Sequence, residues 1–208
     1  MSSSPAQELT TEPTRRHLSS RQAATVQRLT AAAVEELRRH GYDGLTVRNV
    51  AKRAEVAPAT AYTYFTSKEH LVTEVFWRRL QALGETELDA AATSKERTVA
   101  TLSDIALLVA DEPELAAACS VAMLAADPDV KLLRDRIGAE MRRRLETALG
   151  PAADPTVLAA LELSITGALV HAGMGHLTYA DLPGRLAAVT GLVVPSKDET
   201  DDKGSAAR

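Results

Sequence analysis

Apolar residues recur at steps of three and four along almost the whole chain after residue 19, and no stretch alternates apolar and polar positions as a strand does. The first stripe predicts a helix that begins at a capping serine, Ser19 or Ser20, and ends at Gly41. Its apolar positions are Val26, Leu29, Ala33 and Leu37. The pattern therefore predicts an all-α fold.

Two short helices are predicted next, with a sharp turn between them. Thr46 can cap the first, whose apolar face consists of Val47, Val50, Ala51 and Ala54. A turn at Glu55 leads to a helix from Ala57 to Tyr64, and Pro58 suits its first turn, where a missing N–H costs nothing. This arrangement is typical of a helix-turn-helix, here over residues 46–64.

A long fourth helix is predicted after this pair, because Thr66 and Glu69 have the spacing of a capping box. It links a domain over residues 15–70 to a helical body over residues 71–194. The helices expected in the body cover about 94–110, 112–125, 128–149, 155–179 and 182–193. The polar ends, residues 1–14 and 195–208, are predicted to be disordered tails.

Charge is divided unevenly along the chain. The net charge is −4, but Arg15 to Leu80 carries 12 Lys and Arg against 6 Asp and Glu, while the rest carries 12 against 22. Basic charge concentrated in one domain is what phosphate binding requires, because cations displace counterions only where they face nucleic acid. A solvated face on a small basic domain is the other interpretation.

Cysteine content and hydropathy favour a cytoplasmic protein. Cys119 is the single cysteine, so no intrachain disulfide can form, and Met1–Pro13 lacks the apolar region of a secretory signal. The most apolar stretch, 157–177, contains Glu162, His171 and His176, each costly at the centre of a bilayer. We therefore expect a buried helix of a soluble protein there, and no membrane partner.

The segment from Val56 to Leu71 carries the most chemical information. Small residues at the start of the third helix allow its end to enter a major groove, where Thr60 can reach a base or a phosphate. Tyr62 and Tyr64 place two hydroxyls near the same surface, although partial core packing is an alternative for Tyr62. Phe65 is expected to plug the junction of the first four helices, and Lys68 to bind phosphate at the start of the next.

This segment resembles the TetR family of bacterial regulators. The resemblance covers about residues 20–72 and is carried by Thr60-Ala61-Tyr62-Thr63-Tyr64-Phe65 and Lys68-Glu69-His70-Leu71, extended back through Gly41-Tyr42, Thr46, Val47, Val50, Ala51 and Ala54. Two departures stand out. Glu55 occupies a turn position where Gly is common, which predicts a left-handed backbone costing on the order of 1 kcal/mol, and Ala57 lacks a DNA-contacting hydroxyl.

The resemblance implies a set of DNA-binding residues. Thr46, Thr60, Tyr64 and Lys68 would contact phosphates, with Ala57, Pro58, Thr60 and Tyr62 nearest the groove. Arg48 joins them because it faces outward from the second helix. Arg15, Arg16 and Arg21 form either an arm for the minor groove or a solvated tail.

The resemblance also implies a dimerisation and ligand-binding body. The helices at about 155–179 and 182–193 would pair with their copies across a two-fold axis, and their small residues permit close approach. Candidate pocket residues are Trp77, Leu108, Met123, Met141, Leu145 and His171, for each of which ordinary core packing is the alternative. Their apolar character favours a hydrophobic ligand.

No motif supports catalysis, a cofactor or a metal. His171 and His176 are five residues apart, about 140° around a helix, so they do not share a face as zinc ligands would. The function expected from the resemblance is a dimeric repressor that a small molecule releases from a pseudo-palindromic operator. A DNA-binding protein without a ligand, and a helical interaction module or enzyme that does not touch DNA, are the alternatives.

Overall fold

The computed structural model describes residues 20–84 and 92–195, and within these ranges the chain forms α-helices and no strand. The predicted tails lie outside the described residues, apart from Pro195. The helices are α1 (Ser20–Gly44), α2 (Val47–Arg53), α3 (Pro58–Tyr64), α4 (Lys68–Ala82), α5 (Ser94–Ala106), α6 (Pro113–Ala122), α7 (Pro128–Leu149), α8 (Pro155–Gly173) and α9 (Leu182–Val193). Short 3-10 turns occupy Gly150–Ala152 and Tyr179–Asp181. The predicted all-α fold is confirmed.

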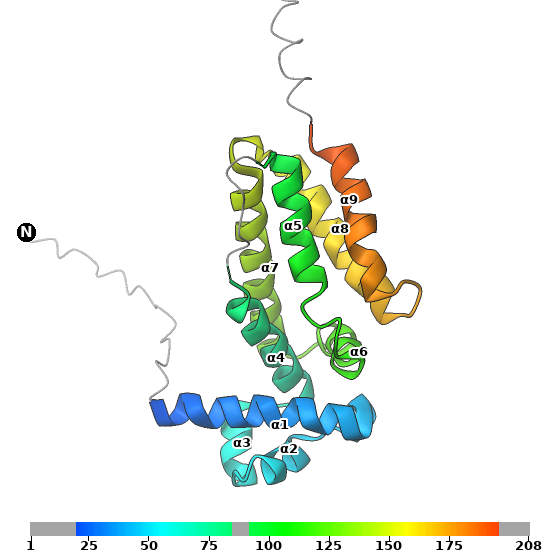
Figure 1. Ribbon diagram of the computed structural model, residues 1–208. Helices are drawn as coiled ribbons and strands as arrows, with labels where there is room; N and C mark the ends of the chain where they lie inside the picture. Colours follow the sequence, from blue (N-terminus) through cyan, green and yellow to red (C-terminus); the bar gives the residue numbers. More distant parts are fainter. Residues whose placement is uncertain (1–19, 85–91, 196–208) are drawn as a thin grey trace, which may run out of the picture.

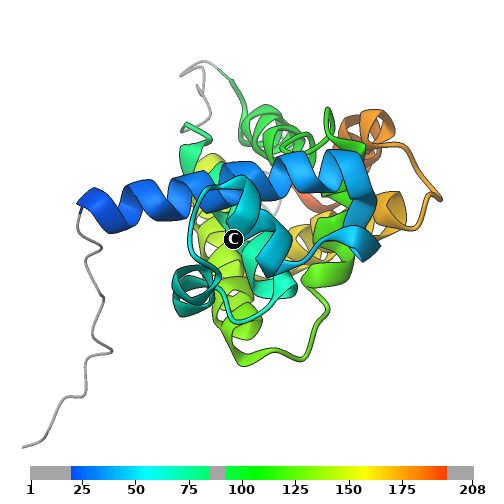
Figure 2. The same cartoon turned by 90° about the horizontal axis from the view of Figure 1, so that it is seen from below.

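The helices form two parts joined by α4. In Figure 1, α1 lies across one end of the molecule with α2 and α3 below it, and α5, α7, α8 and α9 stand above as a body. Figure 2 shows the α1–α3 end face-on, with α1 running across it. Helix α4 packs against α1 on one side and against α6 and α7 on the other, so it belongs to both parts.

The apolar stripes predicted for the first helices form the core of the smaller part. Leu29, Ala33 and Leu37 of α1 are fully buried, as is Val50 of α2. Phe65 is 2% exposed and belongs to the same core, as expected for a plug at this junction. Burial of such side chains is the main term that holds α2 and α3 in place.

The turn between α2 and α3 has the predicted left-handed residue. Glu55 has a φ of 53°, and no other described residue except glycine has a positive φ. The turn is closed by the amide of Val56, which donates to the carbonyl of Ala51 at 2.9 Å. The strain at Glu55 is therefore local and is held by the hydrogen-bonded helix ends.

Replacing Glu55 with Gly is expected to raise the free energy of unfolding by about 1 kcal/mol, because Gly adopts a positive φ without a Cβ penalty. Urea unfolding followed by circular dichroism measures the change. Glu55→Ala removes the carboxylate but keeps the Cβ, and it should bring no such gain. Equal gains in both variants would assign the effect to the charge and not to the backbone.

The start of α4 differs from the sequence-based prediction. Ser67, and not Thr66, is the N-cap, since its hydroxyl accepts from the amide of His70 at 3.0 Å. Thr66 instead donates its hydroxyl to Asp129 at 2.9 Å. The prediction placed the cap one residue early because both residues can cap a helix, and helix ends are uncertain by one or two residues.

Three helices of the body are shorter than predicted. Helix α5 ends at Ala106 and α6 covers Pro113–Ala122, with hydrogen-bonded turns beyond both. Helix α8 ends at Gly173 and not near 179, and Gly175 follows with a φ of 77°. This glycine reverses the chain after α8, as glycines commonly do at helix ends.

Helix α8 is buried on one side only, which corrects the expectation of a buried helix. Leu158, Leu161 and Ile165 face the core, whereas Leu163 is 75% exposed. Among the described helices, α8 alone has the length and apolar composition to span a membrane. Core and interface helices share that composition, so it does not by itself indicate a membrane.

Candidate DNA-binding surface and ligand cavity

Helices α2 and α3 form a braced helix-turn-helix. The Thr46 hydroxyl accepts from the amide of Asn49 at 3.1 Å and so caps α2, as predicted, and its O–H remains free to donate. Glu36, a buried residue of α1, accepts a hydrogen bond from Nε of Arg53 at the end of α2. A buried carboxylate requires such a partner, and this pair fixes α2 against α1.

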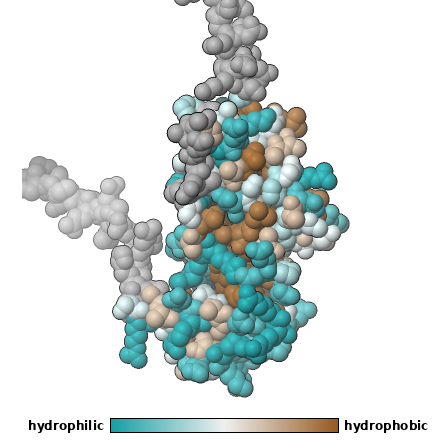
Figure 3. All heavy atoms as spheres, viewed as in Figure 1, coloured by the Kyte–Doolittle hydropathy of each residue, from teal (hydrophilic) through white to brown (hydrophobic). Residues whose placement is uncertain are grey.

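Most of the predicted DNA-binding residues share one property, which is exposure on α2, α3 or their flanks. Thr46, Arg48, Ala57, Pro58, Thr60 and Tyr62 are exposed, whereas Tyr64 and Lys68 are half-buried. Exposed neighbours that the prediction left out are Asn49, Lys52, Ala59 and Thr63. The helix phase alone indicates Lys52, which lies one turn after Arg48. In Figure 3 the surface of this end is mostly hydrophilic.

Tyr62 is the large side chain that α3 presents to solvent. It is 50% exposed, while Ala61 beside it is fully buried. Tyr64 packs against the core. A half-exposed phenol on a short helix combines an apolar ring with a hydroxyl, which suits contact with a thymine methyl or a phosphate.

Lys68 has internal contacts that the sequence did not indicate. Its Nζ donates to the carbonyl of Tyr42 at 3.0 Å and lies 4.1 Å from the centre of the Tyr42 ring. The Tyr42 hydroxyl in turn donates to Glu69 at 2.8 Å. Burial, together with this bond to Glu69, raises the pKa of Tyr42 well above its ordinary value. Lys68 therefore ties the end of α1 to the start of α4, with N–H donors left for a phosphate.

Two aspartates at the start of α7 bind the segment that follows α3. Asp127 accepts from the Ser67 hydroxyl at 2.6 Å, and Asp129 accepts from Thr66 at 2.9 Å. The Ser67 bond lowers the pKa of Asp127, which also caps α7. The body thus contacts the chain two residues after the end of α3.

A second link joins the two parts nearby. Glu112, before α6, forms ion pairs with Arg38 of α1, at 3.1 Å, and with Arg79 of α4. The first link lies at the start of α7 and the second at the start of α6, and α6 also packs against both α1 and α4.

Asp127→Ala is expected to weaken operator binding by about tenfold, because Ser67, and with it α3, loses the contact that orients it against the body. The substitution also removes the cap of α7, which should lower the free energy of unfolding by about 1 kcal/mol. Fluorescence anisotropy with labelled operator and thermal unfolding measure the two effects.

The matched control is Asp154→Ala. Asp154 caps α8 through the amides of Thr156 and Val157, also directly before a proline, but none of its hydrogen bonds reaches the helix-turn-helix. Loss of stability without loss of operator affinity is expected for this variant. Equal loss of affinity in both variants would show that the cap, and not the contact with Ser67, matters for DNA binding.

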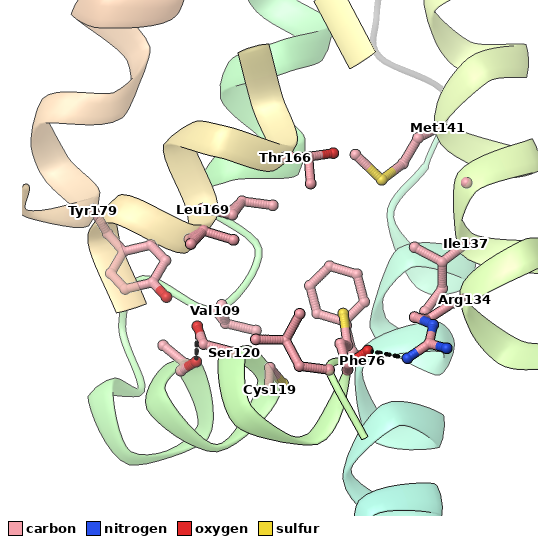
Figure 4. Close-up of a pocket in the computed structure, with 15 residues that line it drawn as sticks. Phe76, Val109, Cys119, Ser120, Arg134, Ile137, Met141, Thr166, Leu169 and Tyr179 are labelled. Carbon is pink, nitrogen blue, oxygen red and sulfur yellow. Dashed lines mark hydrogen bonds between the residues drawn. The ribbon is translucent and has the colours of Figure 1, made fainter. Parts of the chain in front are cut away.

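The body contains an apolar cavity among α4, α6, α7 and α8. Its volume is about 250 Å³, and its lining residues are Phe76, Val109, Ala116, Cys119, Ser120, Met123, Leu124, Arg134, Ile137, Gly138, Met141, Thr166, Leu169, Val170 and Tyr179. In Figure 4 the hydroxyl of Tyr179 points toward Ser120 on one side, and Arg134 lies on the other. Polar groups thus flank an apolar middle.

Two of the six predicted pocket residues line this cavity, Met123 and Met141. Leu145 is fully buried in the core, Trp77 and Leu108 pack against the core, and His171 is exposed on α8. The periodicity indicated that these residues lie on inner faces, but it could not show which of those faces are left unfilled.

Among the lining residues, the thiol of Cys119 and the phenol of Tyr179 are neutral near physiological pH. Burial raises the pKa of Cys119 to about 12, so it is a thiol and not a reactive thiolate. Burial likewise raises the pKa of Tyr179. Within residues 20–84 and 92–195 no cluster of three metal-ligating side chains occurs, and the rings of His171 and His176 meet edge-on at 5.7 Å.

Comparison with known proteins agrees with this architecture. Residues 29–75 match the family model described as bacterial regulatory proteins, tetR family. An HTH-type transcriptional regulator of Mycobacterium tuberculosis is 48% identical over 187 residues, which cover 89% of this chain and 87% of that protein. The HTH-type transcriptional repressor KstR of Rhodococcus jostii is 31% identical over 110 residues, 52% of each chain.

Solved structures show the same fold. A TetR transcriptional regulator from Rhodococcus sp. RHA1 superimposes with a TM-score of 0.71 at 22% identity, over 85% of this chain and 99% of the other. FadR from Bacillus subtilis, solved in complex with stearoyl-CoA, gives a TM-score of 0.60 at 24% identity, over 81% and 97%. On the family match and the mycobacterial relative, the chain belongs to the TetR family of bacterial transcriptional regulators, which are DNA-binding proteins and not enzymes.

Proposed function

We propose that the protein is a cytoplasmic, homodimeric repressor that occupies a pseudo-palindromic operator and is released when a small apolar ligand enters the cavity of the body. The observation that carries this proposal is the exposed surface of α2 and α3, with Arg48, Thr60 and Tyr62, placed next to a body that contains an apolar cavity. The cavity favours a ligand-controlled regulator over one that acts without a ligand.

Dimerisation is needed because one short recognition helix reads few base pairs, and two copies related by a two-fold axis double the readout. Outward faces of α8 and α9 supply a suitable surface, at one edge of the body in Figure 1. Its exposed apolar or small residues are Ala159, Leu163, Gly167, Met174, Gly184, Ala188 and Leu192. Small residues let helices approach closely, and an apolar face of this size requires a partner.

The test of the proposed function is binding of the purified protein to DNA from its own upstream region at several salt concentrations. Selective binding is expected, with an affinity that falls steeply as salt rises, since each neutralised phosphate contributes a slope of about 0.9 in the double-logarithmic plot. Equal binding to a scrambled duplex at every salt concentration would contradict a sequence-specific regulator.

Leu163→Glu is expected to convert the dimer to a monomer and to weaken operator binding by about 100-fold or more, because it places a charge in the apolar interface. Sedimentation velocity measures the first effect and anisotropy the second. Leu132→Glu, at an exposed leucine of α7, is the matched control and should remain dimeric. A dimeric Leu163→Glu variant would place the interface elsewhere.

A further inference from the structure

Arg134 of α7 is the charged residue among those that line the cavity. It lines the apolar cavity and also the groove beside it, where the charged residues Asp135, Arg142 and Glu162 lie. The cavity and the groove therefore meet at this side chain, and a ligand that fills the cavity reaches Arg134 at its edge.

The charge of Arg134 has no carboxylate partner among the described residues. Its Nη1 donates to the carbonyls of Met123 at 2.6 Å and Ala125 at 2.9 Å, while Arg142 in the same groove is paired with Glu162 at 3.1 Å. Two carbonyls engage one nitrogen of a group that has five N–H donors. A half-buried guanidinium in this state favours an anion, which it can bind through two parallel hydrogen bonds.

The apolar part of the cavity defines the rest of the ligand. Phe76, Ile137 and Leu169 are among its walls, and its volume of about 250 Å³ equals on the order of eight water-sized groups at about 30 Å³ each. We propose that the cavity selects an amphiphile with an apolar part of roughly this size and an anionic head, and that Arg134 binds the head. This inference rests on the proposed function, since it specifies the ligand of the same cavity.

The contacts of Arg134 also explain how such a ligand would act. The carbonyls that Arg134 holds belong to residues 123 and 125, and Asp127, two residues later, holds Ser67 after α3. An anionic head that binds the remaining N–H donors pulls the guanidinium away from these carbonyls. The loop over residues 123–127 can then move, and its contact with Ser67, which supports α3, moves with it. A ligand without the charge leaves this connection intact.

The experiment compares three probes of equal chain length, decanoate, decyl phosphate and decanol, by calorimetric titration of the full chain at neutral pH. At least one anion is expected to bind about 10- to 100-fold more tightly than decanol, the range for a hydrogen bond to a charged group. The anion that binds more tightly distinguishes a carboxylate from a phosphate head. Arg134→Gln should bring the anions to within about twofold of decanol, whereas Arg134→Lys should keep part of the preference.

Arg142→Gln is the matched control, because it removes a charge from the same groove that is already paired, and it should keep the wild-type preference. Two results would overturn the inference: anions that bind no more tightly than decanol, or an anion preference that persists in an Arg134→Gln variant with a wild-type circular dichroism spectrum. Neither result would contradict the proposal that the cavity binds a ligand. Failure of all three probes to bind would overturn the inference as well, and operator binding measured without a probe tests the regulator separately.

Discussion

Simultaneous replacement of Arg48 and Tyr62 by Ala is expected to lower operator affinity by about 1000-fold or more. Each DNA contact of this kind contributes about 1–3 kcal/mol, and the proposed dimer would present each residue twice. The double-logarithmic salt slope should fall by about two, because two phosphate contacts from Arg48 are lost. The melting temperature should stay unchanged, since Arg48 is exposed and the Tyr62 ring is half exposed. Anisotropy at several salt concentrations provides both values.

Two controls separate the contributions. Arg136→Ala removes an equal charge from an exposed site on α7 and should leave operator affinity unchanged. Tyr62→Phe keeps the ring and removes the hydroxyl, so it distinguishes a phosphate bond from an apolar contact with a base. Retention of full affinity by the double variant would show that α2 and α3 do not form the DNA-binding surface.

The helix-turn-helix could be predicted from the sequence because its determinants are local. The cap at Thr46, the proline that starts α3 and the left-handed Glu55 each depend on neighbouring residues, and all three are present in the structure. The burial of Phe65 followed from a wholly apolar side chain at the junction. Local determinants of this kind agree with one another along the chain, which makes such a segment predictable.

Contacts between distant residues could not be predicted in the same way. Lys68 was predicted to bind phosphate, yet its contact with Tyr42 joins residues 26 apart in sequence. Ser67, and not Thr66, caps α4, while the hydroxyl of Thr66 donates to Asp129, 63 residues away. In both cases a side chain with several possible local roles was assigned its role by tertiary packing.

The cavity, like these long-range contacts, could not be predicted from the sequence. Its lining residues Met123 and Met141 lie on apolar faces that the periodicity identified, but so does Leu145, which packs into the core and leaves no space. An unfilled volume is a property of how several helices meet, and no single helix encodes it. Arg134 was not predicted either, because an arginine on an amphipathic helix ordinarily lies on its solvated face.

Arg144→Met is expected to lower the free energy of unfolding by about 3 kcal/mol, because the guanidinium of Arg144, on α7, binds carbonyl groups at the end of α4. The side chain is 5% exposed and donates to the carbonyls of Leu80, Leu83 and Gly84 at 3.2, 2.8 and 2.8 Å. These carbonyls lie at the C-terminal end of the helix, where no further turn satisfies them. Methionine keeps much of the volume but donates nothing, so the carbonyls lose their partner.

The loss corresponds to a fall in melting temperature of about 6 to 12 °C for a chain of this size, measured by circular dichroism at equal protomer concentration, since a dimer's melting point depends on concentration. Arg136→Met, at an exposed position of the same helix, should change it little. Because α4 belongs to both parts of the molecule, a frayed α4 should also weaken communication between cavity and DNA. An Arg144→Met variant as stable as the wild type would mean that packing alone, without this arginine, fixes the end of α4.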